Sequence, residues 1–397
     1  MRKGGVDAVD VVVVGGGPAG TAAAILLGRR GFSVRLFEAR RLPLDKPCGE
    51  GIMPAGAAVL DRLGLRAAVG GRDVDGLRYH GFGRTVEASF ARAGVSPGLA
   101  QRRRVLDAVL WRAASETPGV LLEDRSPVDD VIASGGRIVG VRVRGREQRC
   151  RLLIGADGAA SRVRQLLDLE GPTLRRARAG VRAHYPLAAS ARGEPGAMID
   201  VYLGDGRELY TTPLPGQELL VAVLGSPLAM RGGSAGFDAL VRDEPHLSAR
   251  LAAIPSGEPW RGRAGLAHMA RGGWRPGAVL LGDAAFTLDP LTANGISQAL
   301  VSAEMLAGQG PELLSRDGVI ADRALAAFDR GRWRDARARV HLTKILVALV
   351  RRRLLARGTL AMMQKAPRLL HALVAIAAGG SRARGQVGHD DRAERRR

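Results

Sequence analysis

Cysteine and aromatic residues are scarce in this chain of 397 residues. Its two cysteines, Cys48 and Cys150, cannot build a disulfide framework, which favours a reducing compartment. Aromatic residues make up only 4% of the chain and offer few surfaces on which nucleic-acid bases could stack. The chain lacks a run of about 18 consecutive apolar residues, the length that a membrane span needs. Residues 1–10 do not resemble a signal peptide, so we expect a cytoplasmic protein.

Lysine is almost absent as well, although the net charge is +21. A basic surface attracts polyanions without sequence preference. The arginines, however, are scattered through every segment and form no stripe, so we expect no specific nucleic-acid partner. The seven histidines show no HxH or HExxH spacing, and no metal site is expected.

A glycine-rich turn follows the apolar run at residues 11–14 and is typical of a dinucleotide-binding site. Gly15 allows a tight turn, Gly17 lets the backbone approach a diphosphate, and Gly20 permits close packing of the next helix. Glu38 ends the following apolar run, where its carboxylate can accept a hydrogen bond from a ribose hydroxyl. Together these features predict a nucleotide site.

Three further segments carry motifs. An apolar strand before Asp157 leads to a turn and to a helix that Ser161 can cap. Another strand ends at Asp283, and a helix begins near Gly295, where its N-terminus can face an electron-rich carbonyl. The third segment is the loop at residues 46–51, Lys-Pro-Cys-Gly-Glu-Gly.

The middle of the chain changes character. Strands without intervening helices predict an antiparallel sheet, inserted into the nucleotide domain, and they are expected at residues 183–186, 197–203, 208–212 and 218–224. Apolar and basic residues are interleaved in the helical pattern beyond residue 320. These helices fit either a lid packed on the core or a peripheral contact with a membrane.

In this order, the motifs resemble those of the p-hydroxybenzoate-hydroxylase-like FAD-dependent oxidoreductase superfamily, which includes single-component flavin monooxygenases and geranylgeranyl reductases. The resemblance covers residues 10–310, and the loop at residues 46–49 is most similar to the reductase branch. It implies an α/β fold with a Rossmann-type FAD-binding domain, an inserted antiparallel-sheet substrate domain and a C-terminal helical segment. The expected bounds are 1–75, 98–170 and 265–315 for the FAD-binding domain, 76–97 and 171–264 for the substrate domain, 316–380 for the C-terminal helices and 381–397 for a disordered tail.

The resemblance also implies which residues bind the cofactor. Arg103 would reach phosphate or ribityl oxygens, and Val128 would contact adenine through its backbone. Asp157 would contribute to binding both FAD and the nicotinamide donor. The full expected set is Gly15, Gly17, Ala19, Gly20, Glu38, Cys48, Gly49, Arg103, Val128, Asp157, Asp283, Gly295 and Ile296. One departure is Ala293, which stands where the family usually has glycine.

The activity that the resemblance implies is that of a monooxygenase of secondary metabolism, driven by NADH or NADPH. It would hydroxylate or epoxidise a lipophilic aromatic or prenylated compound with O₂, through a flavin C4a-hydroperoxide. The alternative is an FAD-dependent reductase of isoprenoid double bonds, and Cys48 is the residue that distinguishes the two branches. Cys48 and Tyr210 are the candidate catalytic residues. Cys48 either lies near the flavin or fills a tight loop, and Tyr210 either orients substrate or packs on its strand.

Overall fold

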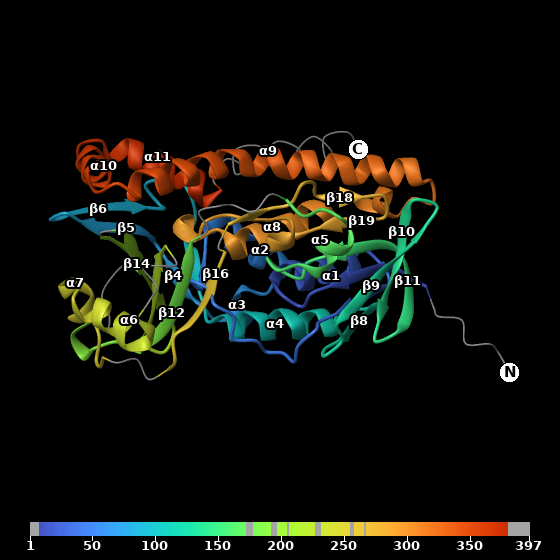
Figure 1. Ribbon diagram of the computed structural model, residues 1–397, viewed down its shortest axis with the longest axis horizontal. Coiled ribbons are helices and arrows are strands. Elements are labelled where there is room, and N and C mark those ends of the chain that lie inside the picture. Colours follow the sequence, from blue (N-terminus) through green and yellow to red (C-terminus); the bar gives the residue numbers. More distant parts are fainter. Residues whose placement is uncertain are drawn as a thin grey trace, which may run out of the picture.

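The computed structural model describes residues 8–171, 178–191, 197–204, 206–226, 232–254, 258–265 and 267–379. The predicted disordered tail at 381–397 lies outside these residues. Within them, the structure has two large sheets with helices on their faces, and a long C-terminal helical layer runs along one side of the molecule (Figure 1). This arrangement confirms the predicted α/β fold.

The first sheet is a mainly parallel one. Its strands, in spatial order, are β18 (Trp274–Arg275), β19 (Ala278–Leu280), β11 (Arg146–Gly155), β1 (Val9–Val14), β2 (Val34–Phe37) and β8 (Val120–Glu123). β9 (Val128–Ser134) and β10 (Arg137–Val143) form an antiparallel hairpin, and β10 also pairs with β11. The four valines at residues 11–14 of β1 are buried because separate apolar clusters pack on the two faces of the sheet.

The helices on this sheet bring the site together. Nearly every residue of α1 (Pro18–Gly28) is buried, and its small side chains let it pack closely against the sheet and two neighbouring helices, α4 (Arg103–Ser115) and α8 (Gly295–Ala307). The shorter elements nearby are α2 (Pro54–Leu63), α3 (Arg66–Val69), α5 (Arg162–Leu166), β3 (Gly51–Ile52), β4 (Arg72–Val74), β7 (Gly98–Ala100), β17 (His268–Met269), β20 (Phe286–Thr287) and the 3₁₀ helices η2 (Gly282–Ala284), η3 (Pro290–Thr292) and η4 (Gly310–Leu314).

The second sheet has seven strands. In spatial order they are β16 (Arg261–Ala264), β12 (Ala179–Pro186), β15 (Glu218–Gly225), β14 (Arg207–Leu214), β13 (Met198–Leu203), β5 (Gly76–Gly81) and β6 (Arg84–Ser89). The four predicted strands pair with one another in antiparallel fashion, as expected, whereas β13 and β5 are parallel. These two strands come from distant parts of the chain, so no tight turn forces them to run in opposite directions.

Each face of the second sheet is covered by different helices. On one face, α6 (Gly233–Arg242) and α7 (Pro245–Ser248) form a core with the sheet, and the 3₁₀ helix η1 (Ala189–Ala191) lies near that core. On the other, α9 (Gly318–Val350), α10 (Arg353–Lys365) and α11 (Pro367–Ala378) contribute side chains to a shared apolar cluster with β5 and β6. Figure 1 shows α10 and α11 lying over these two strands. Among the described residues, no helix combines the length and apolar character needed to cross a membrane.

Candidate functional site

The glycine-rich turn joins the end of β1 to the start of α1. Gly15 has a φ of 111°, and a side chain there would overlap the carbonyl oxygen of Ala156. A side chain at Gly20 would overlap the carbonyl oxygen of Gly15. Only glycine allows this close passage of helix and strand, and the turn lies directly beside the segment that contains Asp157.

The N-terminus of α1 lies beside a half-buried cation. Gly17 is the N-cap residue, and no side chain caps the helix there. The Nζ atom of Lys46 lies 3.9 Å from the position that a Cβ on Gly17 would take. Burial lowers the pKa of Lys46, although the nearby Glu38 opposes this shift. Unpaired N–H groups and an ammonium suit the diphosphate of a dinucleotide.

Glu38 lies where β2 ends and is buried. Its Oε2 accepts a hydrogen bond from the Gly16 amide at 2.8 Å, and its Oε1 accepts one from the Arg40 amide at 3.0 Å. A carboxylate has about four acceptor sites, so two remain for ribose hydroxyls. Backbone amides around the turn therefore hold in place the Glu38 carboxylate, which is the predicted partner of the ribose.

The loop that contains Cys48 is tied to the start of α4. The Arg103 amide donates to Glu50 Oε1 at 2.9 Å, and the Glu50 amide donates to Cys48 Sγ at 3.3 Å. The Arg103 side chain forms an ion pair with Asp107, with 2.9 Å between Nη2 and Oδ2. Burial raises the pKa of the Cys48 thiol, despite the opposing charge of Arg103. This shift disfavours the thiolate, so Cys48 is not activated for nucleophilic attack.

A buried ionic network links this loop to the second sheet. His184 on β12 contacts Glu50 Oε2 through Nε2 at 2.8 Å and Glu258 Oε2 through Nδ1 at 2.9 Å. Arg102 extends the network, with 3.0 Å between its Nη1 and Glu258 Oε1. The sequence motifs assign no role to Lys46, Glu50, Arg102 or Glu258, and His184 lies on a predicted strand outside the motifs. Their only sequence signal was the presence of charges in or beside predicted motifs.

The two aspartate motifs lie in different surroundings. Asp157 accepts hydrogen bonds from Ser161 Oγ at 2.5 Å and from the Val163 amide at 3.0 Å, so it anchors the start of α5. Its role toward a cofactor stays a prediction. Burial raises the pKa of Asp283, although Arg263, Arg103 and Lys46 all oppose the shift. The charges of Arg103 and Lys46, which lie beside and in the Cys48 loop, therefore act on Asp283.

The segment before α8 contains the departure from the family pattern. Ala293 has a φ of 50°, a conformation that favours glycine. No side chain caps α8 at Asn294, and no atom lies within 4 Å of the Cβ position of Gly295. Ile296 is buried just behind. The start of α8 thus offers amide groups toward open space, as binding of a flavin pyrimidine edge requires.

The remaining predicted residues frame this region. Thr212 on β14 donates to the Gly49 carbonyl at 2.7 Å, which joins the Cys48 loop to the sheet. Tyr210 lies on the same strand and is buried; its hydroxyl has no partner among the described residues, and burial raises its pKa well above the ordinary value. Ala19 lies beside the segment that contains Asp283, since a Cβ at Gly282 would lie 3.0 Å from the Ala19 Cβ. Val128 is buried at the start of β9, near the ends of β1 and β2.

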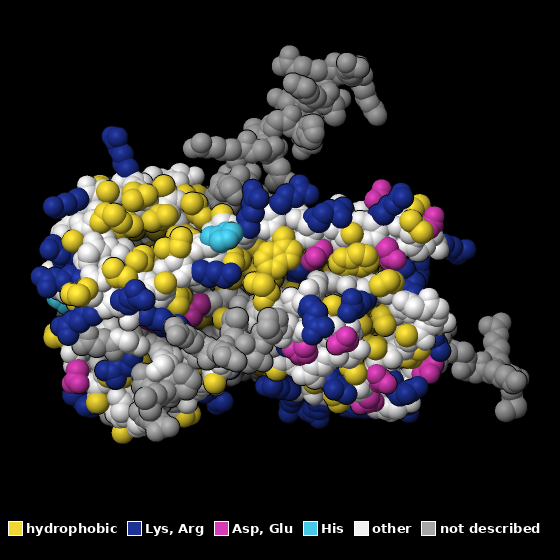
Figure 2. All heavy atoms as spheres, turned by 45° about the horizontal axis from the view of Figure 1, so that its top comes forward, with side chains coloured by type: hydrophobic (Ala, Val, Ile, Leu, Met, Phe, Trp, Pro, Cys, Tyr) yellow, Lys and Arg dark blue, Asp and Glu magenta, His cyan; other side chains and the backbone are white. Residues whose placement is uncertain are grey.

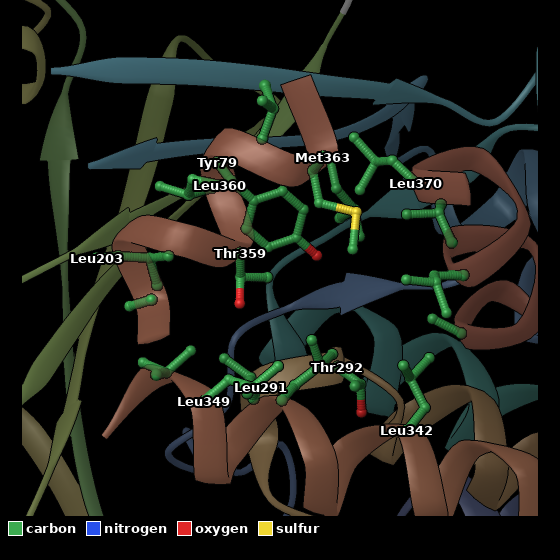
Figure 3. A pocket seen from close by; sticks show the side chains of 18 residues that line it. Tyr79, Leu203, Leu291, Thr292, Leu342, Leu349, Thr359, Leu360, Met363 and Leu370 are labelled. Carbon is green, nitrogen blue, oxygen red and sulfur yellow. The ribbon is translucent and has the colours of Figure 1, made fainter. Parts of the chain in front are cut away.

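An apolar pocket, which the sequence did not predict, lies between the second sheet and the C-terminal helices. In Figure 3 the labelled side chains surround one space, and the Tyr79 hydroxyl points toward it. Burial raises the pKa of Tyr79 to about 12. The walls also include Leu291 and Thr292, which directly precede Ala293. The other lining residues are Leu77, Val86, Leu203, Leu342, Leu346, Leu349, Val350, Ala356, Thr359, Leu360, Met363, Leu370, Leu373, Val374 and Ala377.

These features fit FAD. The glycine turn, Lys46 and Glu38 suit its adenosine diphosphate half, and Asp283 with the start of α8 suits its ribityl and pyrimidine parts. Both groups of residues adjoin the turn around Gly15 and Ala19, so one extended molecule can contact them together.

Comparisons with known proteins agree with this geometry. Residues 8–309 match the family described as FAD binding domain. The chain is 31% identical to the menaquinone reductase of Mycobacterium tuberculosis, over 82% of this chain and 83% of the relative. It is 26% identical to the digeranylgeranylglycerophospholipid reductase of Thermoplasma volcanium, over 75% of this chain and 76% of that relative.

Among solved structures, that of PqsL from Pseudomonas aeruginosa in complex with 2-aminobenzoylacetate is similar in fold. Its TM-score is 0.78 at 23% identity, covering 89% of this chain and 99% of PqsL. The family match spans most of this chain and includes the three motifs described above. The chain therefore belongs to the FAD binding domain family, within the p-hydroxybenzoate-hydroxylase-like superfamily, and is an FAD-dependent oxidoreductase.

Proposed function

We propose that this protein reduces a double bond in the isoprenoid chain of a lipid, with NADH or NADPH as electron donor. The observation that carries the proposal is the apolar pocket, whose wall at Leu291 and Thr292 adjoins the start of α8. A pocket with so few polar groups suits a hydrocarbon chain. The named substrates of the two reductase relatives are lipids that bear isoprenoid chains, which supports the same substrate class.

In this proposal the predicted residues hold FAD through contacts of known type. The turn residues Gly15, Gly17, Ala19 and Gly20 and the cation Lys46 bind the diphosphate. Glu38 binds the ribose, and Asp283 binds the ribityl chain. The amides of Gly295 and Ile296 face the pyrimidine edge. When bound, FAD supplies the hydride equivalent for the reduction.

The chain's own residues have three tasks in the reaction. The Cys48 thiol donates from Sγ the proton that the double bond gains together with the hydride, and the thiolate left behind takes a proton from water when the product leaves. The pocket excludes water and aligns the hydrocarbon chain. The Tyr210 hydroxyl, which is buried without a partner among the described residues, is available to orient a polar group of the substrate.

A second candidate function is the predicted monooxygenase, which would insert one oxygen atom from O₂ into a lipophilic aromatic or prenylated compound. The observation that favours it is the single dinucleotide fingerprint, which leaves the nicotinamide donor without a domain of its own. Such transient donor binding is typical of single-component flavin monooxygenases. The apolar pocket would also protect an oxygen-transfer step from water.

One experiment separates the two activities. The FAD-loaded protein is incubated with NADH or NADPH and menaquinone, under argon and in air. The molecular masses of the products are then measured by mass spectrometry. Reduction of the isoprenoid chain predicts a gain of two hydrogen atoms that occurs under argon and remains after the quinone ring is reoxidised, since reoxidation removes the two hydrogen atoms of a quinol. A product that appears only in air and carries an added oxygen atom would overturn the reductase proposal in favour of the monooxygenase.

Matched cysteine variants test the role of Cys48. We expect Cys48→Ala to lower the turnover number by about 100-fold, the usual scale for loss of a general acid. Cys150→Ala is the control, because Cys150 is buried in β11 and packs in a different apolar cluster. Equal activity in the two variants would rule out proton donation by Cys48. The bound FAD spectrum checks that both variants keep the cofactor.

A further inference from the structure

The C-terminal helices have an unusual charge distribution. Residues 336–379 contain no aspartate or glutamate. Between residues 341 and 379 all seven basic side chains are exposed, and they are Lys344, Arg351, Arg352, Arg353, Arg357, Lys365 and Arg368. Residues 336–379, which include the end of α9 and all of α10 and α11, therefore present a cationic surface without acidic residues of their own.

Large apolar side chains are exposed on the same helices. On α10, Leu354 is 82% exposed and Met362 is 49% exposed; on α11, Leu369 is 43% exposed and Ile376 is 39% exposed. Figure 2 shows a broad apolar area in this part of the molecule, with basic side chains at its edges. We call this surface, formed by Leu354, Leu355, Met362, Leu369 and Ile376 with the basic residues of α10 and α11, the outer face.

The outer face differs from the solvent side of an ordinary surface helix. The inner sides of α10 and α11 already bury Leu360, Met363, Leu370 and Val374 against the second sheet. A helix that packs on one side normally has a polar opposite side, whereas these two helices have apolar residues on both. Apolar residues bordered by cations are the pattern of helices that lie in a membrane interface.

We propose that the outer face is a docking surface for an anionic lipid bilayer. Its leucines and Met362 would enter the headgroup region, while the arginines and lysines bind lipid phosphates. Two copies of this face would repel each other, because both are cationic. Residues 380–397 carry six arginines and three acidic residues, so their charge does not complement the face either. An anionic bilayer matches both the charge and the apolar character.

Docking in this orientation would bring the apolar pocket to the membrane. The outer-face residues Met362 and Leu369 are sequence neighbours of Met363 and Leu370, which line the pocket. A lipid substrate could then pass from the bilayer between α10 and α11 without crossing water. This second step rests on the proposed function, whereas docking itself does not.

Vesicle binding tests the docking. The FAD-loaded protein is sedimented with vesicles of phosphatidylcholine alone and with vesicles containing equal parts of phosphatidylcholine and phosphatidylglycerol. We expect at least about tenfold tighter binding to the anionic vesicles. Raising NaCl from about 0.05 M to about 0.5 M should weaken this binding, because salt screens the attraction. Equal binding to both vesicles, or none to either, would overturn the proposal.

Matched surface variants locate the contact. We expect Leu354→Glu and Arg357→Glu each to weaken binding to the anionic vesicles by about tenfold. The controls are Leu121→Glu, at a leucine 63% exposed on β8, and Arg112→Glu, at an exposed arginine on α4. Both controls lie on the side of the molecule away from α10 and α11 (Figure 1) and should bind as the unaltered protein does.

Other outcomes of the same experiment would contradict the proposal. If the control substitutions weaken vesicle binding as much as the outer-face substitutions do, the net charge of the protein alone explains the binding. If Leu354→Glu converts a dimer to a monomer by light scattering while vesicle binding is unchanged, the face is an interface between copies. Turnover of detergent-dispersed menaquinone separates the two proposals, since a docking failure leaves it unchanged and failure of the reductase function abolishes it.

Discussion

The carboxylate of Glu50 and the imidazole of His184 connect the cofactor-side loop to the second sheet, with 2.8 Å between Oε2 and Nε2. Both side chains are almost completely buried. The other oxygen of Glu50 accepts the Arg103 amide at the start of α4. One carboxylate therefore fixes the position of the loop relative to both of its neighbours.

Glu50→Gln should weaken this connection. The glutamine side chain has one acceptor oxygen in place of two, so either the Arg103 amide or His184 loses its partner. We expect a loss of about 2 kcal/mol in the free energy of unfolding and an FAD dissociation constant raised about tenfold. Denaturant unfolding and flavin fluorescence titration measure the two effects. Glu258→Gln, at a carboxylate 40% exposed, should cost under about 1 kcal/mol.

A double-mutant cycle tests the Glu50 contact itself. Glu50→Gln and His184→Gln should be non-additive by about 1 kcal/mol, because each variant removes the same interaction. Strictly additive losses would show that the two side chains act independently.

Ala293→Gly should stabilise the protein. Ala293 has a φ of 50°, which costs a residue with a Cβ about 1 kcal/mol relative to glycine. We expect the free energy of unfolding to rise by about 1 kcal/mol, measured by denaturant unfolding. Ala348→Gly, on α9 with helical geometry, is the control and should destabilise by about 1 kcal/mol. A loss of stability in both variants would contradict the assignment of strain to Ala293.

Gly20→Ala should disrupt the nucleotide turn. The added methyl group would overlap the Gly15 carbonyl oxygen, a backbone atom that cannot rotate away. We expect a loss of about 3 kcal/mol in the free energy of unfolding, with loss of bound FAD visible in the absorption spectrum. In the control Gly236→Ala, on α6, the added methyl group meets no atom within 4 Å. This variant should keep its bound FAD and should be as stable as the unaltered protein or slightly more stable. Retention of FAD by Gly20→Ala would contradict this account of the turn.

Asp200→Asn should change the dependence of stability on pH. Burial favours the neutral acid, but the hydrogen bond from His80 and the nearby Arg250 and Arg78 hold the pKa of Asp200 below its ordinary value of 3.8. Because the folded pKa is the lower one, the charged carboxylate stabilises the protein above about pH 3.8, and this contribution disappears as pH falls through the folded pKa.

The Asp200→Asn variant should therefore be about 2 kcal/mol less stable than the unaltered protein at neutral pH. The difference should narrow only below about pH 3.8, as followed by urea unfolding at a series of pH values. Asp73→Asn removes an exposed partner of Arg66 and should have little effect at any pH. A difference that stays constant into the acid range would contradict the role assigned to the charge of Asp200.

The sequence was sufficient for the parts of the fold that depend on local geometry. The turn at Gly15 and Gly20 is recognisable because a passage this close between helix and strand tolerates only glycine. The cap at Ser161 follows from a hydroxyl at a helix start, and the structure confirms it, since Ser161 accepts the Arg164 amide at 2.9 Å. Each of these features involves residues only a few positions apart.

Tertiary structure alone decided which distant residues meet. Glu50 and His184 are 134 positions apart, and a buried hydrogen bond between distant side chains leaves no periodic pattern in a sequence. The same holds for the parallel pairing of β13 with β5 and for the apolar pocket. Both are formed by segments that are far apart in the sequence and meet only in the folded protein. Ala293 shows both levels, because the sequence marked the missing glycine and only the backbone revealed its positive φ. The physical reason is that local steric limits are encoded residue by residue, whereas long-range contacts depend on the packing of the whole molecule.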